Sequence, residues 1–315
     1  MYSWSIWAVN DRSFHVEQPY SETLTSCPVC RGASLAPFLR VKDHTVSQEF
    51  FVVQTCASCG FCITNPRPTP TAIGRFYESE AYISHTNTSR GIQERIYQWV
   101  RKRAIRSKHE LISRHHSSGR VLDVGCGTGE FLGYLKSRGY HTQGIEPSPK
   151  AREQAIANHT LDVAPDIDKI PAQDQFRVIT LWHVLEHVHD VRDTLKKLHA
   201  RAESGALIVI AVPDRESWDA KHYGADWAAY DVPRHLSHFR RQDLKRLLEE
   251  QGFSVMATKP MWFDAPYVGM LSERYRGTGT FGALIKGAIL GTASNLVAAT
   301  TTRPTSSSLY LARKA

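Results

Sequence analysis

Apolar strand-like runs alternate with helical patterns through the second half of the chain. Residues 121–124 read as a short buried strand, and apolar residues at helical spacing follow over 130–137. Further strand patterns occupy residues 141–146, 161–164, 175–182, 206–213, 252–258 and 308–312, and another helix is indicated at 241–251. Strands that alternate with helices in this way are typical of a doubly wound, mostly parallel α/β sheet.

A long insertion at about 260–305 separates the last two predicted strands. It contains a helix rich in small residues near 281–299, and Gly282, Gly287 and Gly291 predict close helix packing there. A connection this long is rarely without a role. We expect a lid over the acceptor or a homodimer contact in preference to a lipid-binding surface. No transmembrane segment is expected, because Lys286, Asn295 and small residues interrupt the apolar run.

The first part of the chain divides into two smaller regions. Residues 1–70 hold four paired cysteines and end in the proline-rich stretch 65–70, a stiff, extended exit from a small module. Residues 71–115 read as a helical linker or cap, with a longer helix over about 93–115. Residues 116–315 then form the expected α/β domain.

Composition places the chain among soluble globular proteins. It has 315 residues, 42% apolar and 22% charged, which is enough to bury a large core. The net charge of +8 permits contact with nucleic acid or anionic lipid, but the densest basic run, 101–108, falls on the predicted helix, where a solvated face is the simpler interpretation. No secretory signal pattern opens the chain and the six cysteines do not resemble a disulfide scaffold, so we expect a reducing, cytoplasmic location.

Two Cys-x-x-Cys pairs are separated by 25 residues. The pairs are Cys27 with Cys30 and Cys56 with Cys59. Two such knuckles on a short β-hairpin can place four thiolates tetrahedrally around one structural Zn²⁺. The alternative is four buried free thiols, and a redox dithiol fits a double pair less well. Cys62 and Cys126 are not needed for this site.

Three glycines follow the first strand of the α/β region at alternate positions, 125, 127 and 129. A loop without Cβ atoms can turn sharply and lie against a ligand, and the next helix directs free N–H groups toward it. Glu146 ends the next strand, where nucleoside-binding sheets place a carboxylate that accepts hydrogen bonds from ribose hydroxyls. The glycine spacing differs from Gly-x-Gly-x-x-Gly, which meets a pyrophosphate.

The stretch from Asp123 to Gly129, with Glu146, resembles motif I and the acidic loop of class I S-adenosylmethionine (SAM)-dependent methyltransferases. The resemblance implies a Rossmann-like sheet of seven strands, mostly parallel, with the last strand antiparallel and inserted between the fifth and sixth. The four cysteines beside such a core resemble a bacterial group that includes sugar C-methyltransferases with an N-terminal zinc-ribbon module. A small zinc-ribbon domain is therefore expected at the N-terminus.

The resemblance also implies which residues hold the methyl donor. The glycines would face the amino acid part of SAM, Asp123 would support the loop or the donor's ammonium, and Glu146 would hold the ribose. Asp166 is the expected partner of the adenine amine, with Asp162 and Asp168 as competitors for that role. The full expected set is Asp123, Gly125, Cys126, Gly127, Gly129, Phe131, Glu146, Pro147, Asp166 and His183.

His183, Glu186 and His187 follow the fourth strand of the α/β region. Their His-x-x-Glu-His pattern resembles an inverted zinc-protease signature, which needs both histidines on one helix face. We do not predict a second metal site, because His183 is expected at the strand end and the two rings should diverge. His183 is instead expected to line the donor or acceptor pocket, with a structural hydrogen bond as the alternative for each histidine.

Aromatic residues gather in the loop after the fifth strand. They are Trp218, Tyr223, Trp227, Tyr230 and Phe239. Loops at strand ends carry substrate specificity, so this segment is the candidate acceptor pocket. In the resembling sugar C-methyltransferases a Tyr and a His from this region assist deprotonation, which implies Tyr230 and His235 as catalytic residues, with His187 as a third candidate. The alternative is that His235 and His238 only fasten the loop to the sheet.

We therefore expect an enzyme that transfers the SAM methyl group to a small-molecule acceptor, such as a sugar nucleotide or another secondary metabolite. Alignment of the reacting atoms and removal of an acceptor proton would supply most of the catalysis. Two alternatives stay open. One is an RNA methyltransferase whose zinc module and basic helix grip phosphates, and the other is a SAM-binding module without catalysis.

Overall fold

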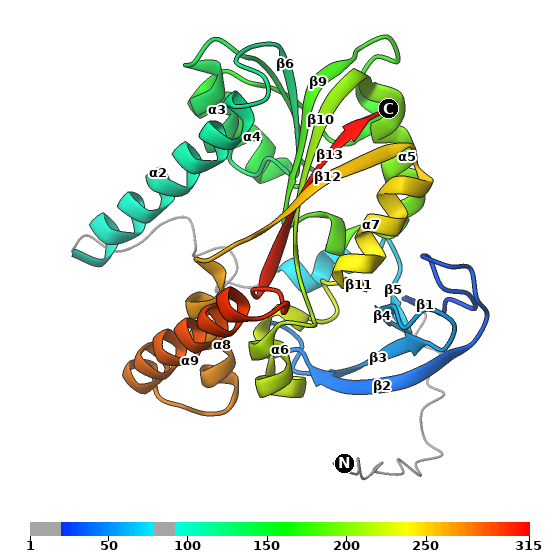
Figure 1. Ribbon diagram of the computed structural model, residues 1–315, viewed down its shortest axis with the longest axis vertical. Helices are drawn as coiled ribbons and strands as arrows, with labels where there is room; N and C mark the ends of the chain where they lie inside the picture. The colour runs from blue at the N-terminus through cyan, green and yellow to red at the C-terminus, as the bar shows by residue number, and fades with distance from the viewer. Residues whose placement is uncertain (1–19, 79–91) are drawn as a thin grey trace.

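Two bodies make up the described part of the protein, which is residues 20–78 and 92–315 of the computed structural model. An α/β domain fills the upper half of Figure 1, and a small β module lies beneath it. The first 19 residues of the predicted module and residues 79–91 of the predicted linker lie outside the described part, and in the helix from residue 92 the side chains are described from residue 101.

A seven-stranded sheet forms the centre of the α/β domain. Its strands are β6 (Arg120–Val124), β7 (His141–Ile145), β8 (Asp162–Ala164), β9 (Phe176–Trp182), β10 (Ala202–Pro213), β12 (Phe253–Pro260) and β13 (Ser307–Lys314). Their spatial order is β12-β13-β10-β9-β6-β7-β8, and β13 runs antiparallel to both of its neighbours. The predicted fold class is confirmed, including the insertion of the last strand between the fifth and sixth.

The fifth strand of this sheet is longer than its pattern predicts. It was expected over 206–213, yet β10 begins at Ala202. Its pairing with β9 shifts register between Ala202 and Leu207, and Gly205 within that stretch has a φ of +72°. Such an irregularity interrupts the apolar pattern while the backbone stays extended, so the sequence pattern alone misses the start of the strand.

Helices cover both faces of the sheet (Figure 1). One face carries α2 (Ile92–Ser113), α3 (Glu130–Lys136) and α4 (Pro149–His159), and the other carries α5 (Val191–Arg201) and α7 (Arg241–Glu250). The strands β6, β9 and β10 supply fully buried side chains to both sides, as a parallel sheet between two helix layers requires. The carboxyl ends of the parallel strands point down in Figure 1, toward the module.

The N-terminal module is a four-stranded sheet that borrows its edge strand from the α/β domain. Its own strands are β2 (Leu35–Lys42), β3 (Phe50–Cys56) and β4 (Cys62–Thr64), beside a small pair formed by β1 (Ser21–Glu22) and β5 (Arg67–Pro68). The fourth strand is β11 (Ser237–His238), which pairs antiparallel with β4. The Thr64 hydroxyl also donates to the carbonyl of His235 at 2.7 Å. The sheet of the predicted module is thus completed by β11, a strand that lies more than 170 residues later in the chain.

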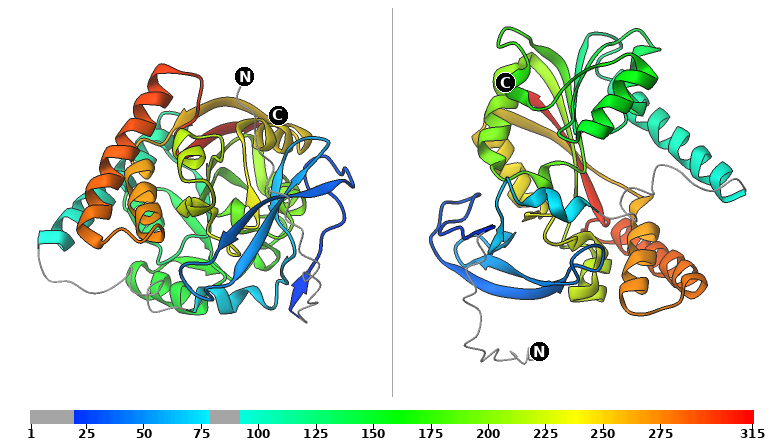
Figure 2. Two further views of the ribbon diagram at one scale, coloured as in Figure 1. Left: turned by 90° about the horizontal axis from the view of Figure 1, so that it is seen from below. Right: turned by 180° about the vertical axis from the view of Figure 1, so that it is seen from behind.

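Three arginines of the α/β domain hold the two cysteine knuckles. Arg192 donates to the carbonyl of Pro28 at 2.6 Å and also to that of Val29, Arg215 donates to the carbonyl of Gly60, and Arg240 donates to that of Cys59. Viewed from below in Figure 2, the strands of the module cross the underside of the α/β domain. The knuckles are therefore docked onto the domain and are not suspended on a free arm.

The insertion forms a helical hairpin, α8 (Asp264–Tyr275) and α9 (Thr280–Thr300), on the opposite side of the lower end from the module (Figures 1 and 2). A Cβ on Gly287 would lie 2.2 Å from the Met270 nitrogen, and one on Gly291 would lie 2.4 Å from the Pro266 nitrogen. The predicted close packing is confirmed at these two glycines. Gly282 meets only the Thr278 side chain, at 3.0 Å, so it is not part of the helix contact.

The outer face of this hairpin is apolar. The large apolar side chains exposed on the hairpin and just before it are Trp262, Phe263, Tyr267, Phe281, Leu284, Ile285, Ile289 and Leu296, and Lys286 is exposed among them. Within the described residues α9 is the one helix whose length and hydropathy suffice for a membrane span, and 22% of that window is buried. A helix at an interface of a soluble protein can have the same length and composition, so the expectation of no transmembrane segment stays a prediction.

The segment between β10 and α7 is built from short helices. They are α6 (Trp218–Tyr223), η5 (Gly224–Asp226) and η6 (Ala228–Tyr230), and three further short helices occur elsewhere: η1 (Ile73–Tyr77), η3 (Ile167–Lys169) and η4 (Leu185–His187). The predicted aromatic loop is thus an ordered layer whose Trp227 and Tyr230 rings are buried. This layer joins the module to the α8–α9 hairpin.

Candidate functional site

The glycine loop lies where the strand order of the sheet reverses. Strand β6 pairs with β7 on one side and with β9 on the other, and open α/β sheets bind ligands beyond the carboxyl ends of the strands at such a point. The loop glycines 125, 127 and 129 all have positive φ, at +71°, +55° and +80°. A Cβ on Gly125 would lie 2.5 Å from a methyl of Val184, whereas one on Gly127 would meet nothing within 4 Å. Gly127 therefore leaves open space beside the loop, into which a ligand can approach the backbone.

Glu146 ties the end of β7 to the glycine loop. The Gly127 N–H donates to its Oε2 at 2.9 Å, and the Ser148 N–H donates to its Oε1 at 2.9 Å. Each carboxylate oxygen has a further lone pair that can accept a hydrogen bond from a ribose hydroxyl. The open space beside Gly127 and this carboxylate together fit a nucleoside ligand.

Asp123 lies buried beneath the loop. The Thr180 hydroxyl donates to its Oδ1 at 2.6 Å. Burial raises the pKa of Asp123 to about 6, although the Thr180 hydrogen bond and the charge of Lys108 act against that rise. The position suits support of the loop, the first of the two roles that the resemblance implies.

Lys108 of α2 lies against two aromatic rings near the glycine loop, and the sequence did not single out this residue. Its Nζ lies 4.3 Å from the centre of the Trp182 ring and 5.6 Å from that of Phe131. The rings of Phe131 and Trp182 are themselves in edge-to-face contact at 5.9 Å. The basic helix, predicted as a solvated face, therefore turns at least this one lysine inward.

The remaining predicted donor residues lie along the same edge of the sheet. Asp166 follows β8, is exposed and accepts hydrogen bonds from the N–H groups of Asp168 and Lys169. Pro147 directly follows Glu146, and the Cys126 sulfur lies 2.6 Å from where a Cβ on Gly144 would be. The competitors of Asp166 are engaged elsewhere, since Asp162 accepts from Gln143 and Asp168 pairs with Lys197. Asp166 thus stays the prediction for the adenine partner.

His183 directly follows β9 and lies beside two carboxylates. Its φ is +56°, its Nδ1 lies 3.4 Å from Glu186 Oε1, and its Nε2 lies 3.2 Å from Asp264 Oδ2 at the start of α8. Burial alone would lower the pKa of His183, but the ion pairs with Asp264 and Glu186 raise it to about 10. His183 is therefore a cation that links the strand end to the inserted hairpin.

Glu186, His187 and His235 form a compact group, called the Glu–His–His cluster below. Their ligand atoms all lie within 4.8 Å of one another, and the two imidazole rings meet edge to face at 4.5 Å. Burial and the neighbouring His235 lower the pKa of His187 to about 4, so His187 is neutral at physiological pH. The structure thus brings together two of the three predicted catalytic residues.

Tyr230, the third predicted catalytic residue, lies in a different environment. Its ring is 3% exposed and packs edge to face on Trp227 and His238, at 5.2 Å from each. Burial raises the pKa of Tyr230 well above its usual range. The apolar cluster around it favours a packing role, and catalysis by Tyr230 stays a prediction.

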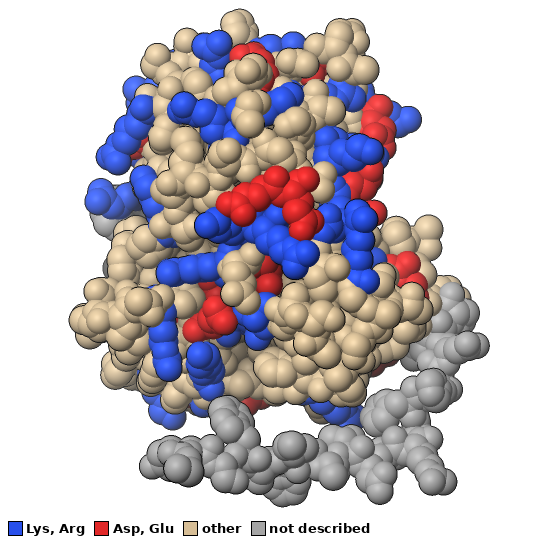
Figure 3. Space-filling model, turned by 45° about the vertical axis from the view of Figure 1, so that its right-hand side comes forward, with Lys and Arg blue, Asp and Glu red and all other residues tan. Residues whose placement is uncertain are grey.

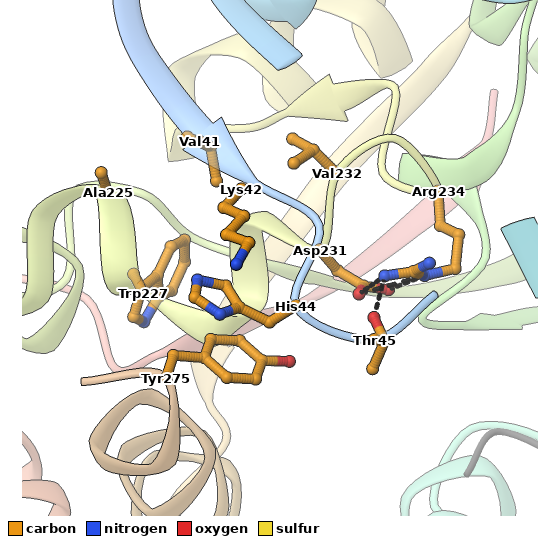
Figure 4. A pocket seen from close by; sticks show the side chains of 10 residues that line it. All are labelled: Val41, Lys42, His44, Thr45, Ala225, Trp227, Asp231, Val232, Arg234 and Tyr275. Carbon is orange, nitrogen blue, oxygen red and sulfur yellow. Dashed lines mark hydrogen bonds and ion pairs between the residues drawn. The ribbon is translucent and has the colours of Figure 1, made fainter. Parts of the chain in front are cut away.

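Arg234 fastens the loop of the Glu–His–His cluster to the module. Its guanidinium lies between Asp231 and Thr45 in Figure 4. It also donates to Asp43 at 3.0 Å, and both side chains of that ion pair are buried, at 1% and 0% exposure. Burial alone would raise the pKa of Asp43, but hydrogen bonds from Ser47 and Arg234 lower it to about 2.

The four paired cysteines converge at the end of the module. The sulfurs of Cys27 and Cys59 lie 3.7 Å apart, those of Cys30 and Cys56 lie 3.5 Å apart, and all four lie within 4.8 Å of one another. Zinc–sulfur bonds of about 2.3 Å in a tetrahedron place sulfurs about 3.8 Å apart. The residues therefore fit a Zn²⁺ ion, and Cys62 and Cys126 lie outside the group.

A comparison with protein families finds one match. The family described as "Methyltransferase domain" matches residues 97–258, about half of the chain. The match spans the glycine loop, Glu146 and the Glu–His–His cluster, and it leaves the four cysteines and the α8–α9 hairpin outside.

Curated relatives share the same part of the chain. A ubiquinone biosynthesis O-methyltransferase from Bradyrhizobium diazoefficiens is 29% identical over 123 residues, which are 36% of this chain and 49% of that protein. The enzyme of the same description from Aeromonas salmonicida is 27% identical over 150 residues, 43% of this chain and 63% of that protein. The chain thus spans about half to two thirds of the length of these relatives.

A solved structure shows the same fold. The magnesium protoporphyrin IX methyltransferase of Synechocystis, solved with bound SAH, is similar over 77% of this chain and 99% of its own. Its TM-score is 0.50 and its sequence identity 13%. At that identity the likeness concerns the fold alone.

Proposed function

This chain belongs to the methyltransferase-domain family, and we propose that it is a SAM-dependent methyltransferase whose acceptor is a small molecule. The observation that carries the proposal is the adjacency of two sites. The glycine loop contacts Val184, and the residues on either side of Val184 are His183 and the start of η4, which carries Glu186 and His187 of the Glu–His–His cluster. A donor on the loop and an acceptor on the cluster would therefore be neighbours.

SAM would be held by the residues at the carboxyl ends of β6, β7 and β8. The loop from Gly125 to Gly129 would lie along its amino acid part, the Glu146 carboxylate would accept from its ribose, and Asp166 would accept from the adenine amine. When bound, SAM supplies a methyl group on a positively charged sulfur. The chain itself contributes alignment, exclusion of water and a place for the acceptor's proton.

His235 is the proposed base for that proton. Its Nδ1 lies 2.8 Å from the carbonyl of Ala229, and a carbonyl can only accept, so Nδ1 carries the hydrogen and Nε2 has a free lone pair. The Asp231 carboxylate lies 3.9 Å from that Nε2 and would stabilise the imidazolium after proton transfer.

Several observations support a small acceptor over RNA. The cluster lies against the module, where Thr64 donates to the His235 carbonyl, and the start of α8 pairs with the neighbouring His183, so a polymer would have to approach between these elements. On the face that Figure 3 shows, basic and acidic side chains are interspersed and do not form a continuous basic track. The curated relatives that match are named for a small-molecule O-methylation, which favours an oxygen acceptor.

We further propose that Cys27, Cys30, Cys56 and Cys59 hold a structural Zn²⁺ ion. The support is the sulfur geometry together with the small core of the module, which a metal would supplement. In this role the ion would fix the two knuckles against Arg192, Arg215 and Arg240.

The test is methyl transfer from isotopically labelled SAM in a cell extract that contains both metabolites and RNA. We expect label in the small-molecule fraction and a mass gain of one methylene in a single metabolite. His235→Gln should lose most of this transfer while it keeps SAM affinity, and His141→Gln, at the opposite end of the strands, should lose none. Label in RNA alone would refute the proposal, as would the absence of transfer to any acceptor.

A further inference from the structure

Each histidine of the Glu–His–His cluster is oriented by a hydrogen bond that its Nδ1 makes with a backbone carbonyl. In His235 the Nδ1–H donates to the Ala229 carbonyl at 2.8 Å. In His187 the Nδ1 lies 3.1 Å from the Arg234 carbonyl and 3.0 Å from the Tyr77 hydroxyl. Both contacts of His187 are satisfied together only when Nδ1 carries the hydrogen, because the carbonyl has none to give. The Nε2 atoms of both rings are then bare lone pairs.

Glu186 adds a carboxylate whose environment is unusual for a buried charge. The residue is 1% exposed, and among the described residues neither of its side-chain oxygens has a hydrogen-bond partner. His183 approaches Oε1 at 3.4 Å as an ion pair, which leaves Oε2 without a close partner. A buried carboxylate normally accepts several hydrogen bonds, so these oxygens indicate a missing partner.

These two features are the ones that a metal centre requires. Metal-binding histidines donate their second ring N–H to a carbonyl or carboxylate, which fixes the tautomer and aims the other nitrogen at the ion. Two imidazole nitrogens and one carboxylate oxygen form a donor set that divalent transition metals prefer.

We propose that Glu186, His187 and His235 bind one divalent transition-metal ion of the Zn²⁺ type, and that this ion binds the oxygen of the methyl acceptor. The part of this proposal that concerns the acceptor rests on the proposed function. The part that concerns the metal rests only on the geometry of the Glu–His–His cluster. This site differs from the one that the His-x-x-Glu-His pattern resembles, in which His183 and His187 would be the two imidazole ligands. His183 is not a member of this group, because its two ring nitrogens are paired with Glu186 and Asp264, and the second imidazole comes from residue 235 instead.

A metal here would change the role of His235 from base to ligand. An acceptor hydroxyl bound to the ion would release its proton to water, because a divalent cation lowers the pKa of a bound O–H group. The resulting oxyanion would then form the new O–C bond as the S–C bond of the donor breaks, and the donor's sulfur would leave as a neutral thioether. An acceptor with a second oxygen beside the reacting one would chelate the ion.

The probe for this site is Co²⁺ added to protein that a chelator has brought to one equivalent of zinc, so that the four-thiolate site is filled and the Glu–His–His cluster is empty. The four-cysteine site is then filled, so additional Co²⁺ reports on nitrogen and oxygen ligands through weak visible ligand-field bands without thiolate charge-transfer bands. We expect wild-type protein to bind about one equivalent. Glu186→Gln and His235→Gln should each weaken Co²⁺ binding at least about a hundredfold, since loss of a direct ligand exceeds the 10–100-fold cost of losing an outer partner.

His141→Gln is the matched control, because it removes an exposed imidazole at the start of β7 and should leave Co²⁺ affinity unchanged. SAM affinity by calorimetry and zinc content check that each variant is folded. If Glu186→Gln does not fold, the wild-type protein alone decides the test. The proposal is then overturned if wild-type protein binds no Co²⁺ in addition to the metal in the four-cysteine site. Unchanged Co²⁺ affinity in folded Glu186→Gln also overturns it.

The same samples separate this inference from the proposed function. Co²⁺ binding without methyl transfer to any small molecule would overturn the function and leave the metal site standing. Methyl transfer to a small molecule without Co²⁺ binding would overturn the metal site, and the Glu–His–His cluster would then act as an acid–base group only.

Discussion

The proposed donor side and the proposed acceptor side of the site, called the donor side and the acceptor side below, are assembled in different ways. The donor side comes from one stretch of chain, in which β6, the glycine loop and Glu146 follow one another and bond directly. The acceptor side is assembled from η1, η4, the loop after η6, and α8, which lie far apart in sequence. The donor side can therefore form from local structure, whereas the acceptor side depends on how the module and the hairpin dock.

This difference predicts that the two sides can be damaged separately. Changes in the module or the hairpin should impair the acceptor side while SAM still binds. Changes in the glycine loop should abolish SAM binding while the module, its zinc and the ion pair of Arg234 stay intact.

The largest expected effect is that of Cys27→Ser. A structural zinc contributes about 10–16 kcal/mol of apparent binding energy in small metal modules, so loss of one thiolate should release the ion and unfold the knuckles. We expect a fall in zinc content by mass spectrometry and loss of methyl transfer, with SAM affinity within about threefold of wild type. Cys62→Ser is the control, because Cys62 is a buried cysteine of the same sheet outside the ligand group. Loss of SAM binding in Cys27→Ser would show that the two sides are not separable.

Asp43→Asn tests the docking of the module by its buried ion pair. Removing one charge of a buried pair costs about 3–5 kcal/mol, and the melting temperature should fall accordingly. The pKa of Asp43 is lowered to about 2 from an ordinary 3.8, so its contribution to stability is present above pH 4 and is lost as the pH falls toward 2. Wild-type protein should show this acid-dependent loss and Asp43→Asn should show less of it, as measured by thermal melts between pH 5 and 2. Equal acid sensitivity of the two proteins would contradict the assignment.

Gly127→Val tests the donor side alone. The φ of +55° strains any β-branched residue, and the added methyl groups would occupy the space proposed for SAM. We expect SAM affinity by calorimetry to fall at least a hundredfold, about 2.7 kcal/mol, with normal zinc content. Gly74→Val is the control, because Gly74 has open space around it and lies on the module side. Unchanged affinity in Gly127→Val would refute the donor site.

Gly287→Ala gives the smallest of these effects and tests the hairpin. Its Cβ would lie 2.2 Å from a backbone nitrogen of α8, and overpacking of this kind costs about 1–3 kcal/mol. We expect a lower melting temperature and weaker acceptor turnover through the shift of Asp264, with SAM affinity unchanged. Gly282→Ala, in the same helix but outside the contact, should be neutral or slightly stabilising. If both variants behave alike, the hairpin is not held by this packing.

The sequence predicts the local structure of the proposed donor side because the signals for it are local. The glycine spacing, the strand before it and Glu146 lie within one βαβ unit, and the sheet order follows from the alternation of strands and helices. The module's cysteines are predicted for the same reason, since their spacing reports a hairpin. Asp166 and the location of the protein stay predictions.

The acceptor side escapes sequence reasoning because its contacts have no local pattern. Arg234 pairs with Asp43 and Tyr77 bonds His187 across separations of 191 and 110 residues. Asp264 opens a helix that was predicted only as an insertion. The histidines themselves were singled out, but their tautomers and the bare oxygens of Glu186 depend on partners that only the folded chain brings near.

The borrowed strand of the module has a consequence for the order of synthesis. Strand β4 ends at Thr64, whereas its partner β11 begins at Ser237, so a ribosome completes most of the parallel sheet before the edge of β4 is covered. Until then the nascent module presents an open strand edge, the kind of surface that pairs with other chains. Early metal capture by the knuckles would order the half-built module while this edge is still open and so disfavour its pairing with other chains, and growth in zinc-poor medium should therefore increase the aggregation of newly made chains.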